Sequence, residues 1–187
     1  MRWDTERGTW TNATGEDLPI PLSRPETDQM TLVVDSNGGR CNHCLCKTDA
    51  EGNPLVLFRY GQPGRIRFTR WQEAAWTDPV QITDTLVRQD GDMVFEESGV
   101  LRVVMYGDRS NGGGEVSWWR SENCGSTWTK EQTVTESDTM RYRVSALVHD
   151  AHPDGQIVFY EIDPKSQAEQ RRLYLWGQGG IVQRNAG

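Results

Sequence analysis

The chain has 187 residues, a formal net charge of −7 and 35% hydrophobic residues. Acidic and basic residues are mixed along it, which disfavours nucleic acid as a partner because phosphate binding requires a basic face. No apolar run approaches the roughly 18–20 residues that span a membrane, so we expect no membrane partner. Residues 1–30 contain no apolar segment typical of a signal peptide. Eight Trp and nineteen Gly against four Phe favour many short strands joined by turns over a helical bundle.

The first 35 residues predict only edge structure. An outer strand of a repeating unit is expected to begin at Trp10, and Leu18–Leu22 contains too much proline for a central strand. Met30–Asp35 is expected to pair as an extra edge strand. No segment of ten or more residues keeps a helical period, so no helix is predicted.

An internal repeat follows. Three segments are β-branched and aromatic, end in Tyr and follow a Gly-bearing turn; they are Pro54–Tyr60, Val100–Tyr106 and Gln156–Tyr160. The three tyrosines are 46 and 54 residues apart. This spacing is close to the length of one four-stranded propeller blade.

Each repeated segment is flanked by three further predicted strands. One precedes the Gly-bearing turn, one carrying Trp follows the Tyr, and an outer strand comes last. These strands are His43–Thr48, Arg65–Trp71 and Trp76–Thr83; Asp92–Phe95, Glu115–Arg120 and Trp128–Thr135; and Arg143–His149, Arg172–Trp176 and Gly180–Arg184. The pattern predicts one all-β domain, a partial β-propeller with four-stranded antiparallel blades at 42–84, 90–135 and 141–184. Residues 1–29 would be the outer strand of a preceding blade.

One segment of the middle unit resembles a known motif. Ser121–Trp128 reads Ser-Glu-Asn-Cys-Gly-Ser-Thr-Trp and is similar to the Asp box, Ser-x-Asp-x-Gly-x-x-Trp, of sialidases and other BNR-repeat proteins, with Asn123 in place of the Asp. A short side-chain acceptor can cap backbone N–H groups across a turn, and Gly125 permits positive φ. We therefore expect Ser121, Asn123, Gly125 and Trp128 to have a structural role.

The N-terminal segment contains an incomplete copy of this motif in Asp4–Trp10. Its continuation through Leu22 resembles the BNR-repeat group that contains ulvan lyases, rhamnose–glucuronate lyases and related rhamnosidases. The resemblance implies a ring of six or seven blades, so we expect a fragment of about three and a half blades whose partners are the remaining blades and an oligo- or polysaccharide. It implies a secreted or periplasmic protein, and we expect no cofactor. An open arc exposes apolar sheet faces, so the chain alone is expected to aggregate or oligomerise.

The resemblance also implies candidate site residues. In the resembled lyases, His and Tyr transfer protons while Arg and polar side chains neutralise a uronic carboxylate, on which negative charge develops during proton abstraction. An imidazole at the start of an inner strand can transfer protons near neutral pH. The catalytic candidates are therefore His43, Tyr60 and Tyr142. The substrate-binding candidates are Asn42, Gln62, Arg65, Arg141 and Arg143.

Each candidate also has a purely structural interpretation. His43 could be a hydrogen-bonded channel residue, and Tyr60 could be a packing residue equivalent to Tyr106 and Tyr160. Arg141 and Arg143 could pair with acidic residues of a surface turn. Three cysteines, Cys41, Cys44 and Cys46, lie beside His43, but no second cluster completes four zinc ligands. We therefore predict no metal and expect small buried thiols instead.

Three functions remain open from the sequence. The leading hypothesis is a carbohydrate-active polysaccharide lyase or glycosidase that acts on acidic glycans, with β-elimination at a uronic acid as the expected reaction. The first alternative is a fragment of an exo-sialidase. The second is a propeller that binds glycans or acts as a scaffold without catalysis.

Overall fold

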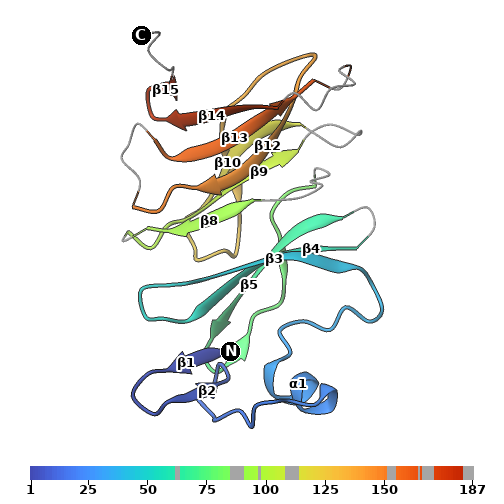
Figure 1. The fold of residues 1–187 in the computed structure, drawn as a ribbon, viewed down its shortest axis with the longest axis vertical. Coiled ribbons are helices and arrows are strands. Elements are labelled where there is room, and N and C mark those ends of the chain that lie inside the picture. The colour runs from blue at the N-terminus through green and yellow to red at the C-terminus, as the bar shows by residue number, and fades with distance from the viewer. Residues whose placement is uncertain are drawn as a thin grey trace.

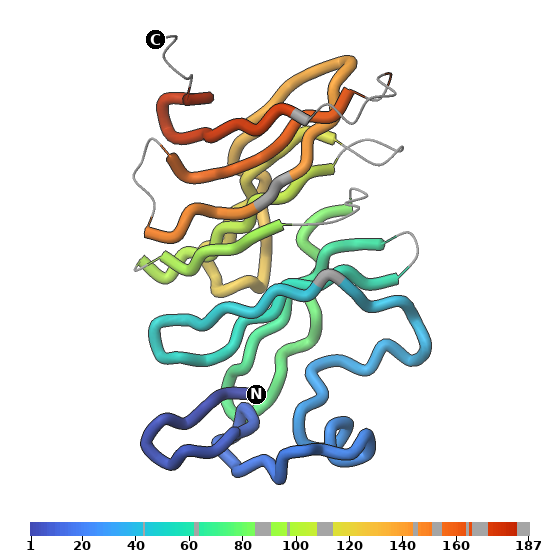
Figure 2. The backbone as a smooth tube through the Cα atoms, in the orientation of Figure 1, coloured from blue at the N-terminus to red at the C-terminus, as the bar shows by residue number. Residues whose placement is uncertain are grey.

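The structure is a computed structural model that describes residues 1–61, 64–84, 91–96, 98–107, 114–150, 155–163, 165 and 171–182, with only the backbone of His43, Val144, Ser145 and Arg171. Its strands form three antiparallel sheets stacked in chain order (Figure 1). A hairpin of β1 (Arg2–Asp4) and β2 (Thr9–Thr11) and the helix α1 (Arg24–Thr31) precede them. The N-terminal hairpin and the last described strand, Gly180–Val182, lie at opposite ends of the stack (Figure 2).

Each sheet is built from strands that are consecutive in the sequence. The first contains β3 (Cys41–Thr48), β4 (Pro54–Tyr60), β5 (Arg65–Gln72), β6 (Ala75–Trp76) and β7 (Val80–Gln81), with β6 and β7 both paired to β5. The second contains β8 (Asp92–Phe95), β9 (Leu101–Gly107), β10 (Glu115–Ser121) and β11 (Thr129–Thr133). The third contains β12 (Arg141–Leu147), β13 (Ile157–Ile162), β14 (Arg171–Gly177) and β15 (Gly180–Val182). Within the described residues no sheet closes on itself.

The all-β prediction is confirmed, because the described elements are strands apart from one short helix. β4 and β8 have the predicted bounds. The predicted outer strand Trp76–Thr83 is instead divided into two pairs of residues, β6 and β7. The three residues between them include Pro79, which has no N–H to donate to a ladder.

Two predictions for the N-terminal region are wrong. A helix is present, and Met30–Asp35 forms no strand because Met30 and Thr31 belong to α1. The Glu26 carboxylate accepts hydrogen bonds from the Ser23 N–H at 2.7 Å and the Ser23 hydroxyl at 2.6 Å, which stabilises the first turn. No residue of α1 is buried, so the helix lacks the apolar period by which helices are recognised. No helix in the described part of the chain is long and apolar enough to cross a membrane.

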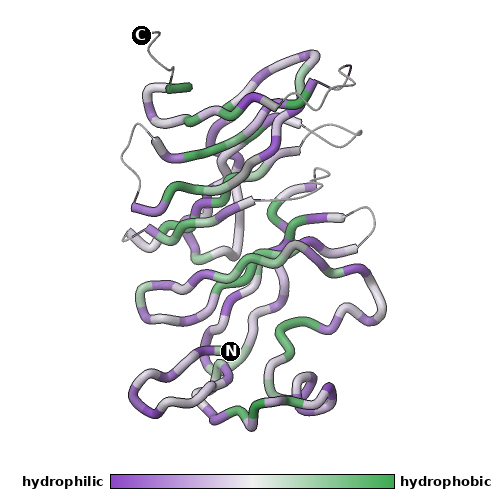
Figure 3. Tube along the Cα trace, in the orientation of Figure 1, coloured by the Kyte–Doolittle hydropathy of each residue, from purple (hydrophilic) through white to green (hydrophobic). Residues whose placement is uncertain are grey.

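Alternate residues of a strand point to opposite faces of its sheet. Their apolar side chains form two hydrophobic clusters, one on each side of the second sheet. Leu55 and Leu57 of β4 and Phe68 of β5 pack against Leu101 and Val103 of β9. On the other face of the second sheet, residues of β9 and β10 pack against the third sheet; the buried members are Val104, Tyr106, Val116, Trp118, Ile157, Phe159 and Trp176. Hydrophobic residues accordingly gather along the middle of the stack (Figure 3). Both faces of the second sheet are therefore covered.

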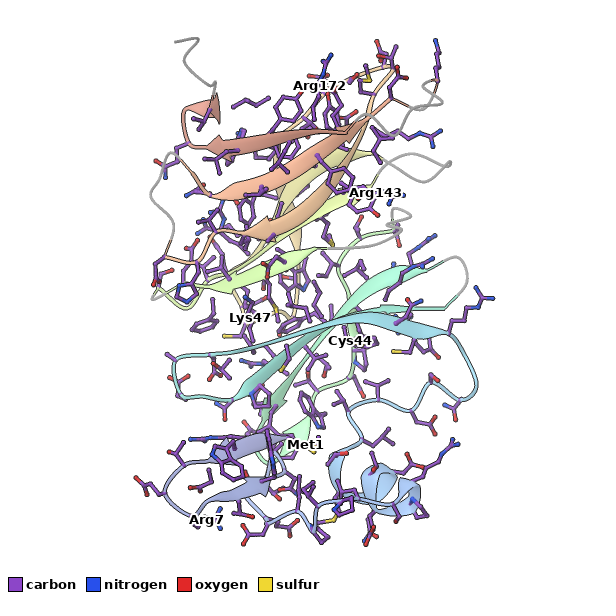
Figure 4. All side chains as sticks on the ribbon, in the orientation of Figure 1. Met1, Arg7, Cys44, Lys47, Arg143 and Arg172 are labelled. Carbon is purple, nitrogen blue, oxygen red and sulfur yellow. The ribbon has the colours of Figure 1, made fainter. Side chains whose placement is uncertain are left out.

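One carboxylate connects the first strands of all three sheets. Asp92, at the start of β8, accepts hydrogen bonds from its neighbour Met93 N–H at 2.8 Å and from Leu147 N–H of β12 at 2.9 Å. Its Oδ1 also lies 3.5 Å from the Nζ of Lys47 on β3 (Figure 4). β3, β8 and β12 therefore lie along one side of the stack.

No described element covers the outer face of the third sheet. Leu173 is 71% exposed, and Val182 and Val148 are also exposed. Leu173 and Leu175 share a strand face, and Leu175 is opposite Val182. This face is therefore a patch that can associate with another apolar surface.

We expect the purified chain to associate as its concentration rises, because this patch is exposed. Leu173→Lys should shift the association to higher concentration, as measured by sedimentation velocity. Ile20→Lys is the control, since Ile20 is 50% exposed but lies outside the sheets. A wild-type chain that stays a monomer at every concentration would contradict this expectation.

Candidate functional site

The candidate residues lie at one edge of the stack. β3 and β5 begin where β4 ends, so the register places Tyr60 between Cys41 on one side and Arg65 on the other. In the third sheet, Arg141 is likewise at the start of β12, opposite the end of β13. The β3–β4 and β8–β9 turns lie at the other edge (Figure 1). The antiparallel topology therefore gathers the predicted residues at one edge, but in two groups separated by the second sheet.

The first group, at the end of the first sheet, centres on Tyr60, which contacts both Ser36 and Arg67. Its hydroxyl donates to the Ser36 carbonyl oxygen at 3.3 Å, and the guanidinium carbon of Arg67 lies 4.9 Å from the centroid of its ring. A cation at this distance from an aromatic face is attracted by the ring quadrupole. Arg67 was not predicted as a site residue.

Tyr60 is not the structural equivalent of Tyr106. Leu55 and Leu57 face the second sheet, so Tyr60, of opposite parity on β4, faces away from it toward Ser36. Tyr106 instead faces the third sheet, which follows its own in the stack. A shift of one residue moves a side chain to the other face of a strand. The packing interpretation based on the Tyr repeat therefore does not apply to Tyr60.

Three arginines of this group have unpartnered buried nitrogens. The Nε of Arg59, the Nη1 of Arg65 and the Nε of Arg67 are buried and make no hydrogen bond. No ion pair joins these three side chains to any residue in the described ranges. Buried polar groups in proteins are nearly always partnered. Arg65 and Arg67 lie on one face of the sheet and Arg59 on the other, so the atoms of Arg65 and Arg67 indicate a place where an anion can bind.

The second group centres on Tyr142. Its ring packs edge-on against Phe159 at 5.9 Å, and its N–H donates to the Gly114 carbonyl oxygen at 3.2 Å. Burial, assisted by the nearby carboxylate of Glu161, raises the pKa of Tyr142 above 10.0, while a hydrogen bond with Ser137 acts in the opposite direction. The neutral phenol, which can donate a proton, is therefore favoured.

Arg141 and Arg143 lie on the other face of β12 from Tyr142, since alternate residues of a strand point to opposite faces. Figure 4 shows Arg143 near the candidate edge of the third sheet. Both side chains are half-buried. They therefore lie on the sheet face that no other described element covers.

Two candidates fall outside what the structure describes. Gln62 lies in the undescribed segment 62–63, and only the backbone of His43 is placed. That backbone belongs to β3, at the register shift between Asn42 and Leu45. β-bulges re-aim the side chains of a strand and are frequent beside active sites. Asn42 is exposed and lies opposite Arg59.

The expectation of buried thiols is wrong. Cys41, Cys44 and Cys46 are all exposed, because β3 is the edge strand of its sheet and half of its side chains face away from the second sheet. Burial of part of its surface, with the neighbouring Cys44, raises the pKa of the Cys41 thiol above 9.0. Among the described residues, no three His, Cys, Asp or Glu side chains form a metal-binding group.

The Ser121–Trp128 turn lies at the edge opposite the candidates. The Ser121 Oγ accepts from Gly125 N–H at 2.8 Å, and the Asn123 Oδ1 accepts from Thr127 N–H at 2.9 Å. The indole N–H of Trp128 donates to the Gly125 carbonyl oxygen at 3.0 Å, and its ring meets Phe68 of the first sheet edge-on at 5.5 Å. These bonds fix the turn against the neighbouring sheet.

A cavity of about 1140 Å³ lies elsewhere, between the N-terminal segment and the first sheet. Residues around Asn12, the end of α1, the β3–β4 turn, Trp71 and Trp76 line it. None of the predicted site residues does. The cavity therefore does not coincide with the candidate site.

No family model matches the chain. The chain is 28% identical over 193 residues to an ulvan lyase of Nonlabens ulvanivorans and 26% identical over 194 residues to an ulvan lyase, PL25, of Pseudoalteromonas sp. (strain PLSV). Each alignment covers 99% of this chain but only 40% and 39% of the relative. The chain is similar to ulvan lyases along nearly its whole length. The expected resemblance to polysaccharide lyases is thereby confirmed.

Solved structures give the same result. A PL25 ulvan lyase superposes with a TM-score of 0.84 at 26% identity, covering 98% of this chain and 43% of that chain. A second structure of that lyase is bound to -[GlcA(1-4)Rha3S]-. A microbial sialidase at 12% identity superposes with a TM-score of 0.54 over 72% of this chain and 34% of its own, which shows a shared fold. The chain thus spans about 40% of the length of the lyases that it matches.

Proposed function

We propose that this chain is part of a polysaccharide lyase that binds and cleaves an acidic glycan at a uronic acid. The observation that carries the proposal is the similarity to ulvan lyases over 99% of the chain. It is supported by the unpartnered Nη1 of Arg65 at the candidate edge, because a uronic carboxylate is an anion that can occupy such a guanidinium.

We further propose that the three sheets are blades of a sialidase-like, BNR-repeat β-propeller. The blades are 42–84, 90–135 and 141–184, and residues 1–29 supply the outer strand of a preceding blade. The bonds of the Ser121–Trp128 turn support its assignment as an Asp box with Asn123 in the Asp position. The remaining blades of the same protein would then cover the outer faces of the first and third sheets.

The proposed reaction is a β-elimination. A base removes the proton on the carbon next to the carboxylate, the glycosidic C–O bond at the neighbouring carbon breaks, and the departing oxygen receives a proton. The electron pair of the C–H bond becomes a C=C bond conjugated with the carboxylate. Arg65 is the proposed carboxylate partner, since it would neutralise the charge that develops on the carboxylate oxygens. Arg143, on the outer face of the third sheet, is a proposed contact to a neighbouring sugar.

His43 is the proposed base, because an imidazole is poised for proton transfer near neutral pH. A phenol would protonate the departing oxygen. Tyr60 and Tyr142 are the two candidates for this role: Tyr60 lies beside Arg65 in the first sheet, and burial favours the neutral form of Tyr142 in the third. Asn42, Gln62 and Arg141 are the proposed contacts to neighbouring sugars.

The test is to incubate the chain with a polysaccharide of glucuronate and sulfated rhamnose and follow the ultraviolet absorbance of the conjugated C=C bond. We expect absorbance to rise with wild-type protein and about a hundredfold more slowly with Arg65→Met. Arg70→Met is the matched control, because Arg70 lies on the same strand and its guanidinium is hydrogen-bonded to Gln72. No absorbance change on several uronic glycans would contradict the proposal.

A further inference from the structure

We propose that Arg65 and Arg67 form an oxyanion-binding pair in which Arg67, which has no part in the proposed elimination, recognises an acidic group of the glycan. The inference rests on the proposed function in one respect: it takes the acidic group to be part of the glycan substrate. Arg65 and Arg67 lie on one face of β5, two residues apart, opposite Tyr60 and Phe58 of β4. Side chains at this spacing are neighbours along the strand.

The main evidence is that both arginines have a buried nitrogen without a hydrogen-bond partner. Arg65 Nη1 and Arg67 Nε are both shielded from solvent and both lack a hydrogen-bond acceptor. A buried donor on a charged group is costly when it has no acceptor. A bound anion would supply acceptor oxygens to both residues, so the arrangement is explained by a ligand that is itself negatively charged.

The sequence around the pair supplies no internal counter-ion. Pro54–Gln72 contains four Arg and neither Asp nor Glu, although the whole chain has 27 acidic residues and a net charge of −7. Within the described residues no ion pair reaches Arg65 or Arg67, so their positive charge is open to an external partner. An electropositive patch on an acidic protein raises the local concentration of anions.

Arg67 is also fixed in place before any ligand binds. Its guanidinium lies over the Tyr60 ring, and that ring is anchored through its hydroxyl to Ser36. A planar guanidinium held in one orientation offers its donors as a fork that fits the oxygens of a carboxylate or a sulfate ester. Because its orientation is fixed, less conformational entropy is lost on binding.

The test is calorimetric titration of the full chain with sodium sulfate and, separately, sodium glucuronate, at constant ionic strength. We expect at least one anion to bind, and Arg67→Met to weaken that binding about ten- to a hundredfold, the usual effect of losing a charge-assisted hydrogen bond. Binding of sulfate alone assigns the pair to a sulfate ester, and binding of glucuronate alone assigns it to a carboxylate. Arg67→Lys should recover part of the affinity, because it keeps the cation but not the fork.

Two variants are matched controls. Arg70→Met should leave the affinity unchanged. Arg59→Met should do the same, because Arg59 lies on the opposite face of the sheet, where Gly64 packs against its guanidinium. Three results would overturn the pair. The first is that Arg59→Met weakens anion binding as much as Arg67→Met does, and the second is that folded Arg67→Met binds anions as tightly as Arg70→Met. The third is that neither anion binds the wild-type chain.

The outcome separates this inference from the proposed function. Anion binding that depends on Arg67, without any unsaturated product from uronic glycans, would leave the pair standing and remove the lyase. If Arg67→Met forms product with an unchanged KM, the lyase proposal stands and the anion-binding pair is ruled out.

Discussion

Gly125→Ala is expected to destabilise the chain by about 2–5 kcal/mol, a large part of the stability of an ordinary domain. Gly125 has φ +88°, where a side chain is strained by about 1–2 kcal/mol. A Cβ at this position would overlap the ring of Phe68, which is 1% exposed in the core between the first two sheets. Overpacking of such a core adds about 1–3 kcal/mol. Urea unfolding followed by circular dichroism measures the loss.

The matched control is Gly99→Ala. Gly99 has φ +84°, but a Cβ there would meet no atom within 4 Å. The backbone strain is therefore nearly the same and the steric overlap is absent, so we expect a cost of about 1–2 kcal/mol. Equal losses at the two glycines would mean that the Ser121–Trp128 turn does not press against the first sheet.

His43→Ala is expected to lower turnover about 10²–10⁴-fold, the usual effect of removing a general base. Substrate affinity should change little, because the carboxylate is held by Arg65 in the proposed site. Initial rates of C=C formation across a range of glycan concentrations give both quantities. The imidazole is thus predicted to act on the reaction step and not on binding.

His149→Ala is the control for this prediction. His149 lies at the β12–β13 turn, at the edge away from the candidate residues, and its side chain is 89% exposed with its Nδ1 2.8 Å from an Asp150 carboxylate oxygen. It should leave turnover unchanged. Unchanged turnover in a folded His43→Ala variant would identify His43 as a structural residue and leave glycan binding as the better account.

The strands were predictable because their signals are local. β4 and β9 combine β-branched and aromatic residues with a Gly-bearing turn before them, a pattern with few other solutions. The helix α1 was missed because it is short and wholly exposed, so no apolar period marks it. Its capping box, Ser23 with Glu26, is nonetheless present in the sequence together with Pro25, and these residues are a recognised start signal.

The site was less predictable because sheet faces depend on register. Aligning Tyr60 with Tyr106 by sequence puts them on equivalent faces, whereas the core residues of β4 and β9 show that they point opposite ways along the stack. Arg67 was missed for a related reason, since its contact with Tyr60 runs diagonally across two strands. The signal that could have found it is the run of four Arg without an acidic residue in Pro54–Gln72.

The exposed cysteines show a similar limit. Cys41, Cys44 and Cys46 lie on a first strand, which would be crowded in a closed ring of blades. In this chain β3 is an edge strand, and the three thiols are open to solvent. Whether a strand is covered depends on what packs beside it, and the sequence of the strand itself does not contain that information.

Cleavage of a uronic glycan by elimination is distinguished from hydrolysis by digesting the glycan in ¹⁸O-labelled water and measuring the masses of the fragments by mass spectrometry. Elimination adds no water, so we predict fragments with an unsaturated terminal uronate and no ¹⁸O. Saturated fragments that each carry one ¹⁸O would show hydrolysis by a glycosidase and contradict the account.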